Sequence, residues 1–209
     1  MLDVHDLLAT LASTRPVFHS EADFQHSLAW QLHLMHPTAQ IRLEKPYGRM
    51  HIDISSAIEG QRYIFELKYK THGVSVTVDG ESFHLQNHGA QPPSRYDFMK
   101  DLARLESIVH PAQPPIRGFA VFLTNDDTYW RSPRTLPGVS ADFSIHDGRR
   151  VSGQLDWSQN ASGGTKKNRE EKVSLAAEYA LTWRDYSEIG ANRHAQFRCL
   201  VVPVNSLNG

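Results

Sequence analysis

The amino-acid sequence predicts a mixed α/β fold in which helices flank a mixed central sheet. Apolar residues recur at helical spacing around 20–36 and 95–109. Between 41 and 86, and again at 116–124, they alternate with polar residues or form short runs, as they do in strands. The sequence has no internal repeat and no clear linker. We therefore expect residues 1–209 to form a single domain.

Composition and charge narrow the classes of function. The chain has 209 residues, of which 40% are hydrophobic and 22% charged, a balance typical of a globular protein with a core. Its formal net charge is −1. A nucleic-acid partner therefore has to be bound by a local basic surface, because the molecule as a whole has no strong positive field.

The sequence also gives an expected compartment. Cys199 is the one cysteine, so no disulfide forms within the chain and a reducing compartment is expected. No signal peptide is recognisable, and no stretch approaches the roughly 20 apolar residues that span a bilayer. We expect a cytoplasmic protein that does not enter a membrane.

Two helices are expected before the first strand. Residues 2–13 carry four leucines at helical spacing, which predicts a short amphipathic helix. Ser20 followed by Asp23 resembles a capping box and predicts the start of a second helix. The buried stripe of this second helix consists of Phe24, Leu28 and Leu32. The helix ends at His36-Pro37, because the residue before a proline disfavours helical geometry.

Two hairpins follow. Residues 50–58 and 61–70 are expected to pair around a turn at Glu59-Gly60. A second hairpin, 74–86, is predicted by Asp79-Gly80, a strong two-residue turn signal. The other elements expected in this part of the chain are a strand at 41–47, a helix at 95–109 and a buried strand at 116–124.

The last third of the sequence carries weaker signals. Asp147-Gly148 indicates another turn. The polar, Gly-rich stretch 158–172 predicts a mobile loop. The final strands are expected at 179–185 and 197–204.

The first hairpin carries the candidate chemistry. Glu66 and Lys68 alternate with apolar residues on its second strand and therefore share one face. A turn at Glu59-Gly60 pairs residues whose numbers sum to about 119. Asp53 is then expected directly opposite Glu66, with Cβ atoms about 4.5–5.5 Å apart. His51 is expected opposite Lys68.

These residue types suit a divalent metal site. Opposed carboxylates repel one another, and Mg²⁺ is a hard cation held by one or two carboxylates together with waters and phosphate oxygens. Lys68 can orient or help deprotonate a water, or neutralise charge on a phosphate. Glu21, beside the buried stripe of its helix, can supply a third carboxylate. The alternative is that Glu-x-Lys only marks a solvated sheet face, as it does in many alternating strands.

The arrangement resembles the core of the PD-(D/E)XK nuclease superfamily, which has the restriction-endonuclease-like fold. The resemblance covers about residues 18–125 and rests on a helix with Glu21, a strand with Asp53 and a strand with Glu66-Leu67-Lys68, followed by a helix and a strand. It implies that Asp53, Glu66 and Glu21 bind Mg²⁺, with Mn²⁺ as a substitute. It also implies that Lys68 acts on the attacking water.

Two departures from the superfamily pattern are visible. Ile52 stands where a proline usually precedes the Asp, and the hairpin 74–86 is inserted before the next helix. Residues after 125 have no counterpart. The resemblance implies a metal-dependent nuclease acting on DNA, in a role such as restriction, repair or phage defence. It leaves the oligomeric state open, with a homodimer among the arrangements it implies. The alternative is a non-catalytic nucleic-acid or protein binding module on the same fold.

Further residues are weaker candidates for nucleic-acid contact. Tyr96, Lys100 and Arg104 share one face of the 95–109 helix, which is either a solvated face or a phosphate-binding one. Lys166 and Lys167 in the Gly-rich stretch can contact a nucleic-acid backbone. Trp130, near Arg131 and Arg134, either stacks on a base or belongs to the core. The Gly-x-Ser-x-Gly motif of hydrolases and a Walker loop are both missing.

Overall fold

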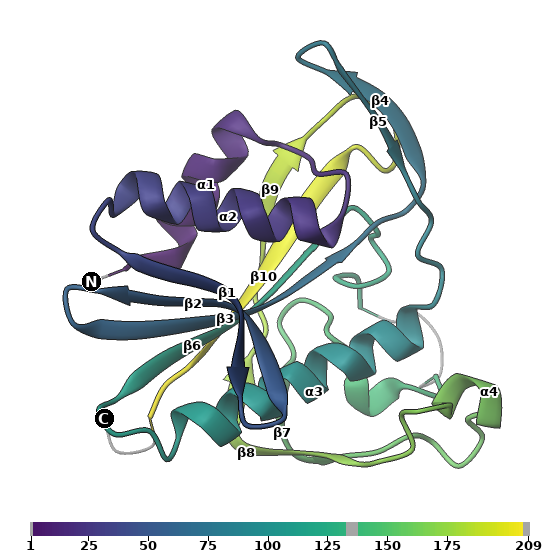
Figure 1. Cartoon of the computed structure of the whole chain (residues 1–209). Coiled ribbons are helices and arrows are strands. Elements are labelled where there is room, and N and C mark those ends of the chain that lie inside the picture. Colours follow the sequence, from purple (N-terminus) through teal and green to yellow (C-terminus); the bar gives the residue numbers. More distant parts are fainter. Residues whose placement is uncertain (1, 133–137, 207–209) are drawn as a thin grey trace.

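A computed structural model describes residues 2–132 and 138–206. Its centre is a six-stranded mixed sheet in the order β1-β2-β3-β6-β10-β9 (Figure 1). β3 and β6 are parallel, and the other neighbours are antiparallel. The strands of this sheet are β1 (Gln40–Tyr47), β2 (Met50–Ile58), β3 (Gln61–Lys70), β6 (Ile116–Thr124), β9 (Trp183–Glu188) and β10 (Gln196–Val204). The mixed α/β fold with a central sheet is therefore confirmed.

Four helices and two small sheets complete the described chain. The helices are α1 (Val4–Thr14), α2 (Glu21–Met35), α3 (Gln91–Val109) and α4 (Gly163–Lys166), with a short 3-10 turn, η1, at Ala141–Phe143. The small sheets pair β4 (Val74–Val78) with β5 (Glu81–Leu85), and β7 (Arg150–Leu155) with β8 (Val173–Ala180). The inserted hairpin predicted at 74–86 is thus present and forms a sheet of its own.

The two faces of the central sheet are covered by different elements (Figure 1). Helices α1 and α2 pack on one face, where Phe65, Leu67 and Val121 enter a shared apolar cluster. Helix α3, together with β7 and β8, packs on the other face against Ile64 and Phe122. The alternation of side chains along β3 and β6 divides them between the two cores, because successive residues of a strand point to opposite faces.

Most of the predicted elements are confirmed. Glu59 and Gly60 have φ values of 49° and 83°, and Asp79 and Gly80 have 50° and 83°. Positive φ at both central residues is the geometry of a two-residue hairpin turn, which fixes the strand register. The predicted cap is also present, since Ser20 Oγ accepts a hydrogen bond from the backbone N–H of Asp23.

Three expectations need correction. Helix α3 begins at Gln91 rather than at Arg95, because two prolines occupy its first positions, where no N–H is required. The strand predicted at 179–185 is two strands, since β8 ends at Ala180 and β9 begins at Trp183. The Gly-rich stretch predicted as a loop contains helix α4. Among the described residues, no helix is long and apolar enough to cross a membrane.

Helix α3 is joined to β8 by a buried carboxylate. Glu106 is 5% exposed and accepts hydrogen bonds from Ala176 N (2.8 Å), Ala177 N (2.9 Å) and the Tyr179 hydroxyl (2.8 Å). We expect Glu106→Ala to lower the free energy of unfolding by about 2 kcal/mol, because three donors lose their acceptor. Urea denaturation measures this change. The exposed Glu178→Ala on the same strand should stay within about 0.5 kcal/mol of wild type, and an equally small loss in Glu106→Ala would contradict the prediction.

Candidate active site

Strand β2 changes direction at Asp53. The pairing with β3 follows the predicted register from Ile58 opposite Gln61 to Ile54 opposite Phe65 and ends there. Ile54 packs in the α1/α2 core, whereas Ile52 packs in the α3 core. Residues two apart on a regular strand point to the same face, so the strand turns over between them.

This turn corrects the predicted pairing of the site residues. Asp53 and Glu66 are not partners in the ladder, and His51 does not pair with Lys68. The carbonyl of His51 instead accepts a hydrogen bond from Arg104 Nη2 (2.7 Å). Strand β1 is also irregular where it lies beside Asp53: Glu44, between the paired residues Leu43 and Lys45, has a φ of 49°. A local distortion that spans both strands was not visible in the alternation of residues.

Beyond Ile54, where the backbone pairing of β2 with β3 ends, the Asp53 carboxylate accepts the hydrogen bond of a β3 backbone N–H. Its Oδ2 accepts a hydrogen bond from Leu67 N at 2.6 Å, and Leu67 stands between Glu66 and Lys68 in the chain. Gln25 of α2 holds the same turn by donating to the Asp53 carbonyl (2.8 Å). Burial raises the pKa of Asp53 to about 6, although the Leu67 N–H and the Lys68 ammonium both favour the ionised form.

Glu66 is the most deeply buried carboxyl group of this set. It is 3% exposed, and its Oε1 lies 3.1 Å from Arg104 Nη2 without a hydrogen bond of good geometry. Burial and the neighbouring Asp101 and Asp53 carboxylates raise the pKa of Glu66 to about 9. The surroundings of Glu66 therefore favour its protonated form relative to that of an exposed glutamate.

Lys68 is held by a residue of helix α3. Its Nζ lies 2.6 Å from Asp101 Oδ2, and both side chains are largely buried. Burial alone would lower the pKa of Lys68, but the charge and hydrogen bond of Asp101 outweigh it, so the pKa is raised. The lysine therefore remains an ammonium ion in this environment.

Asp101 was not among the predicted site residues, and Arg104 was predicted on a helix face with Tyr96 and Lys100 rather than beside Glu66. Asp101 pairs with both Lys68 and Arg104, and the Arg104 Nη1–Asp101 Oδ1 distance is 2.9 Å. A signal for Asp101 was present, because it lies three residues after Phe98 and four before Leu105, on the apolar side of the helix.

Glu21 lies beyond the Asp53–Glu66 pair along β3. Its Oε2 accepts a hydrogen bond from Tyr69 N (2.8 Å) and lies 3.3 Å from Lys70 Nζ, and its side chain is 43% exposed. Within residues 2–132 and 138–206, no group of three or more His, Cys, Asp or Glu side chains is placed to hold one metal ion. Glu21 is thus near the site but does not join the other two carboxylates.

The residues predicted to contact nucleic acid differ in their exposure and in their partners. Tyr96 is 1% exposed and stacks on Trp157, so its predicted place on an open helix face is wrong. Lys100 pairs with Glu171 at 2.8 Å. Lys166 closes α4, and Lys167 follows it on the surface.

The second aromatic candidate is a core residue. Trp130 is buried and packs against Trp183. Of the two predicted roles, stacking on a base or packing in the core, the structure favours the core. Arg131 pairs with Asp127 at 3.1 Å. Arg134 lies outside the described residues.

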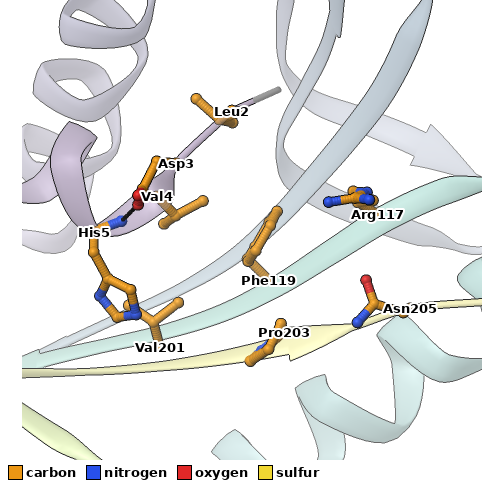
Figure 2. Close-up of a pocket in the computed structure, with 9 residues that line it drawn as sticks. All are labelled: Leu2, Asp3, Val4, His5, Arg117, Phe119, Val201, Pro203 and Asn205. Carbon is orange, nitrogen blue, oxygen red and sulfur yellow. Dashed lines mark hydrogen bonds between the residues drawn. The ribbon is translucent and has the colours of Figure 1, made fainter.

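A pocket of about 420 Å³ lies elsewhere, between the start of α1 and strands β6 and β10 (Figure 2). Phe119 and Val201 form part of its wall, and none of the predicted site residues lines it. Among the described residues that line it, the carboxylate is that of Asp3, which already accepts hydrogen bonds from His5 N (2.8 Å) and Asp6 N (3.2 Å) as the cap of α1. This pocket therefore adds nothing to the acidic site.

Comparison with protein-family models, curated proteins and solved structures found no match. The functional interpretation therefore depends on the geometry of the site. Three carboxyl groups and two cations from β2, β3 and α3 meet at the turn of β2: Asp53, Glu66, Asp101, Lys68 and Arg104. Such a network can bind a cation through its buried carboxylates and can contact a phosphate through its ammonium and guanidinium groups.

Proposed function

We propose that this protein is a Mg²⁺-dependent nuclease of the PD-(D/E)XK type that hydrolyses phosphodiester bonds in DNA. One observation carries the proposal. The Asp53 carboxylate is bound to the backbone N–H of Leu67, between Glu66 and Lys68 on the adjacent strand. The turn of β2 at Asp53 agrees with the superfamily pattern, in which an Asp ends or bends one strand beside Glu-x-Lys.

The residues fit a divalent cation. Asp53 and Glu66 would hold it, because Asp53 is half-buried, Glu66 is buried, and Glu66 Oε1 has no hydrogen bond of good geometry. Burial raises their pKa values to about 6 and about 9, and a divalent cation would favour the ionised form of both carboxyl groups. When bound, the metal would supply Lewis-acid polarisation of a phosphate oxygen and a more acidic water.

The protein's own cations complete the proposed chemistry. Lys68 stays protonated beside Asp101, so in this site it orients a water or neutralises charge on the phosphate. The Asp101 carboxylate fixes the position of the ammonium. Asp53 is fixed by its hydrogen bond to Leu67 N, which limits the reorganisation required when substrate binds.

One observation favours the second candidate, a non-catalytic binding module. Lys68 and Arg104 are already paired with carboxylates of the same chain. A network that neutralises its own charges can serve to join α3 to the sheet without any chemistry. Metal-dependent cleavage of DNA therefore distinguishes the proposed nuclease from a binding module.

The proposal is tested with purified protein, single- and double-stranded DNA and RNA, and Mg²⁺ or Mn²⁺. We expect cleavage of DNA that requires the metal and is lost in Asp53→Asn, by roughly 10²-fold or more. The exposed Asp185→Asn serves as a matched control and should retain activity. Absence of cleavage with every substrate and metal, together with a well-folded protein, would favour the binding module.

A further inference from the structure

Arg104 makes three contacts within the candidate active site. Its Nη2 lies 3.1 Å from Glu66 Oε1 and donates a hydrogen bond to the His51 carbonyl at 2.7 Å. Its Nη1 donates to Asp101 Oδ1 at 2.9 Å. The guanidinium group thus connects β2, β3 and α3 at the turn of β2.

These contacts differ in quality. The hydrogen bonds to His51 and Asp101 are aligned, whereas Glu66 Oε1 is buried and receives no hydrogen bond of good geometry. Arg104 therefore supplies Glu66 mainly with nearby positive charge. Exchanging the Glu66 contact for another cation gives up no aligned hydrogen bond to Glu66 itself, although the same Nη2 atom would also have to leave the His51 carbonyl.

A metal ion and Arg104 would compete for the same carboxylate. A divalent cation held by Asp53 and Glu66 would carry charge of the same sign as the guanidinium, at a distance where the two repel. Arg104 can move away from Glu66 and keep its hydrogen bond to Asp101. A guanidinium released in this way is suited to a phosphate, which it binds with two parallel N–H donors.

We infer that Arg104 occupies the metal's place at Glu66 in the metal-free protein and is displaced toward the substrate phosphate when the metal binds. This inference rests on the proposed function and adds a gating residue to its metal site. Arg104 would thus weaken metal binding by charge repulsion, and its displaced guanidinium group would then contact the substrate phosphate.

The inference is tested by Mn²⁺ binding to the full chain, with free Mn²⁺ measured by electron paramagnetic resonance. Arg104→Gln should bind Mn²⁺ about tenfold more tightly than wild type, because a repelling charge is removed. Arg104→Lys keeps the charge and should bind Mn²⁺ as weakly as wild type. Arg150→Gln, an exposed arginine on β7, is the matched control and should not change the affinity.

The outcomes separate the inference from the proposed function. If wild type binds Mn²⁺ and Arg104→Gln binds it equally or more weakly, the inference is wrong and the nuclease proposal stands. If wild type and Arg104→Gln both fail to bind Mn²⁺, both are wrong. Tighter binding by Arg104→Gln alone supports the inference whether or not DNA is cleaved.

A second measurement does not depend on the variants folding. In a crystal structure of the wild-type protein with Mn²⁺, we expect Arg104 Nη2 to lie well beyond 3.1 Å from Glu66 Oε1 while Nη1 still contacts Asp101. A metal-bound structure in which Arg104 keeps its contact with Glu66 would overturn the inference.

Discussion

Replacing Glu66 with glutamine is expected to reduce DNA hydrolysis by roughly 10³-fold while making the metal-free protein more stable. Hydrolysis falls because an amide is a poor ligand for Mg²⁺ and Glu66 is one of two carboxylates proposed to hold the metal. Rates measured at saturating metal, together with thermal unfolding in a chelator, test the two effects separately.

The stability effect follows from the direction of the pKa shift. The folded protein raises the pKa of Glu66 to about 9 from an ordinary value of 4.5, so ionisation of this group opposes folding. The penalty grows as the pH rises above 4.5 and is complete above about 9. Glutamine carries no charge, so Glu66→Gln should raise Tm by at least roughly 3 °C at pH 8, equivalent to about 1 kcal/mol.

Two outcomes would contradict this prediction. Full activity in Glu66→Gln would remove Glu66 from the proposed metal site. A lower Tm at pH 8 would mean that the carboxylate is ionised and stabilised by Arg104 in the free protein. Glu178→Gln, on the surface beside Arg150, is the matched control and should change neither the rate nor the Tm appreciably.

Lys68→Met is expected to reduce hydrolysis by roughly 10²–10³-fold and also to destabilise the fold. The ammonium is the proposed cation for the phosphate or the water. Its removal also leaves Asp101, which is largely buried, with Arg104 as its remaining cation. Breaking a buried pair in this way costs about 3 kcal/mol. Steady-state rates and urea denaturation measure the two effects.

A double variant separates the two roles of Lys68. Lys68→Met with Asp101→Asn removes both charges of the pair, so much of the lost stability should return. Activity should not return, because the cation is still missing. If the double variant recovers both stability and hydrolysis, the role of Lys68 is structural only and the proposed catalytic role of its ammonium is wrong.

The sequence determined the parts of the fold that depend on local patterns. Asp79-Gly80 and Glu59-Gly60 set two hairpin registers, because positive φ at both central residues leaves one way for the strands to pair. The apolar stripe of α2 and the run 116–124 identified a helix and a buried strand from their periodicity alone. Glu66 and Lys68 were correctly expected on a strand beside Asp53.

The tertiary structure decided how these residues meet. β2 turns over at Asp53 because Ile52 and Ile54 are buried in opposite cores, and no local pattern encodes which core an isoleucine enters. Asp101 and Arg104 are distant in the chain, and only the packing of α3 on the sheet brings them to Glu66 and Lys68. The sequence therefore determined which strand carries Glu66 and Lys68, whereas long-range packing decided their partners, their burial and hence their charge.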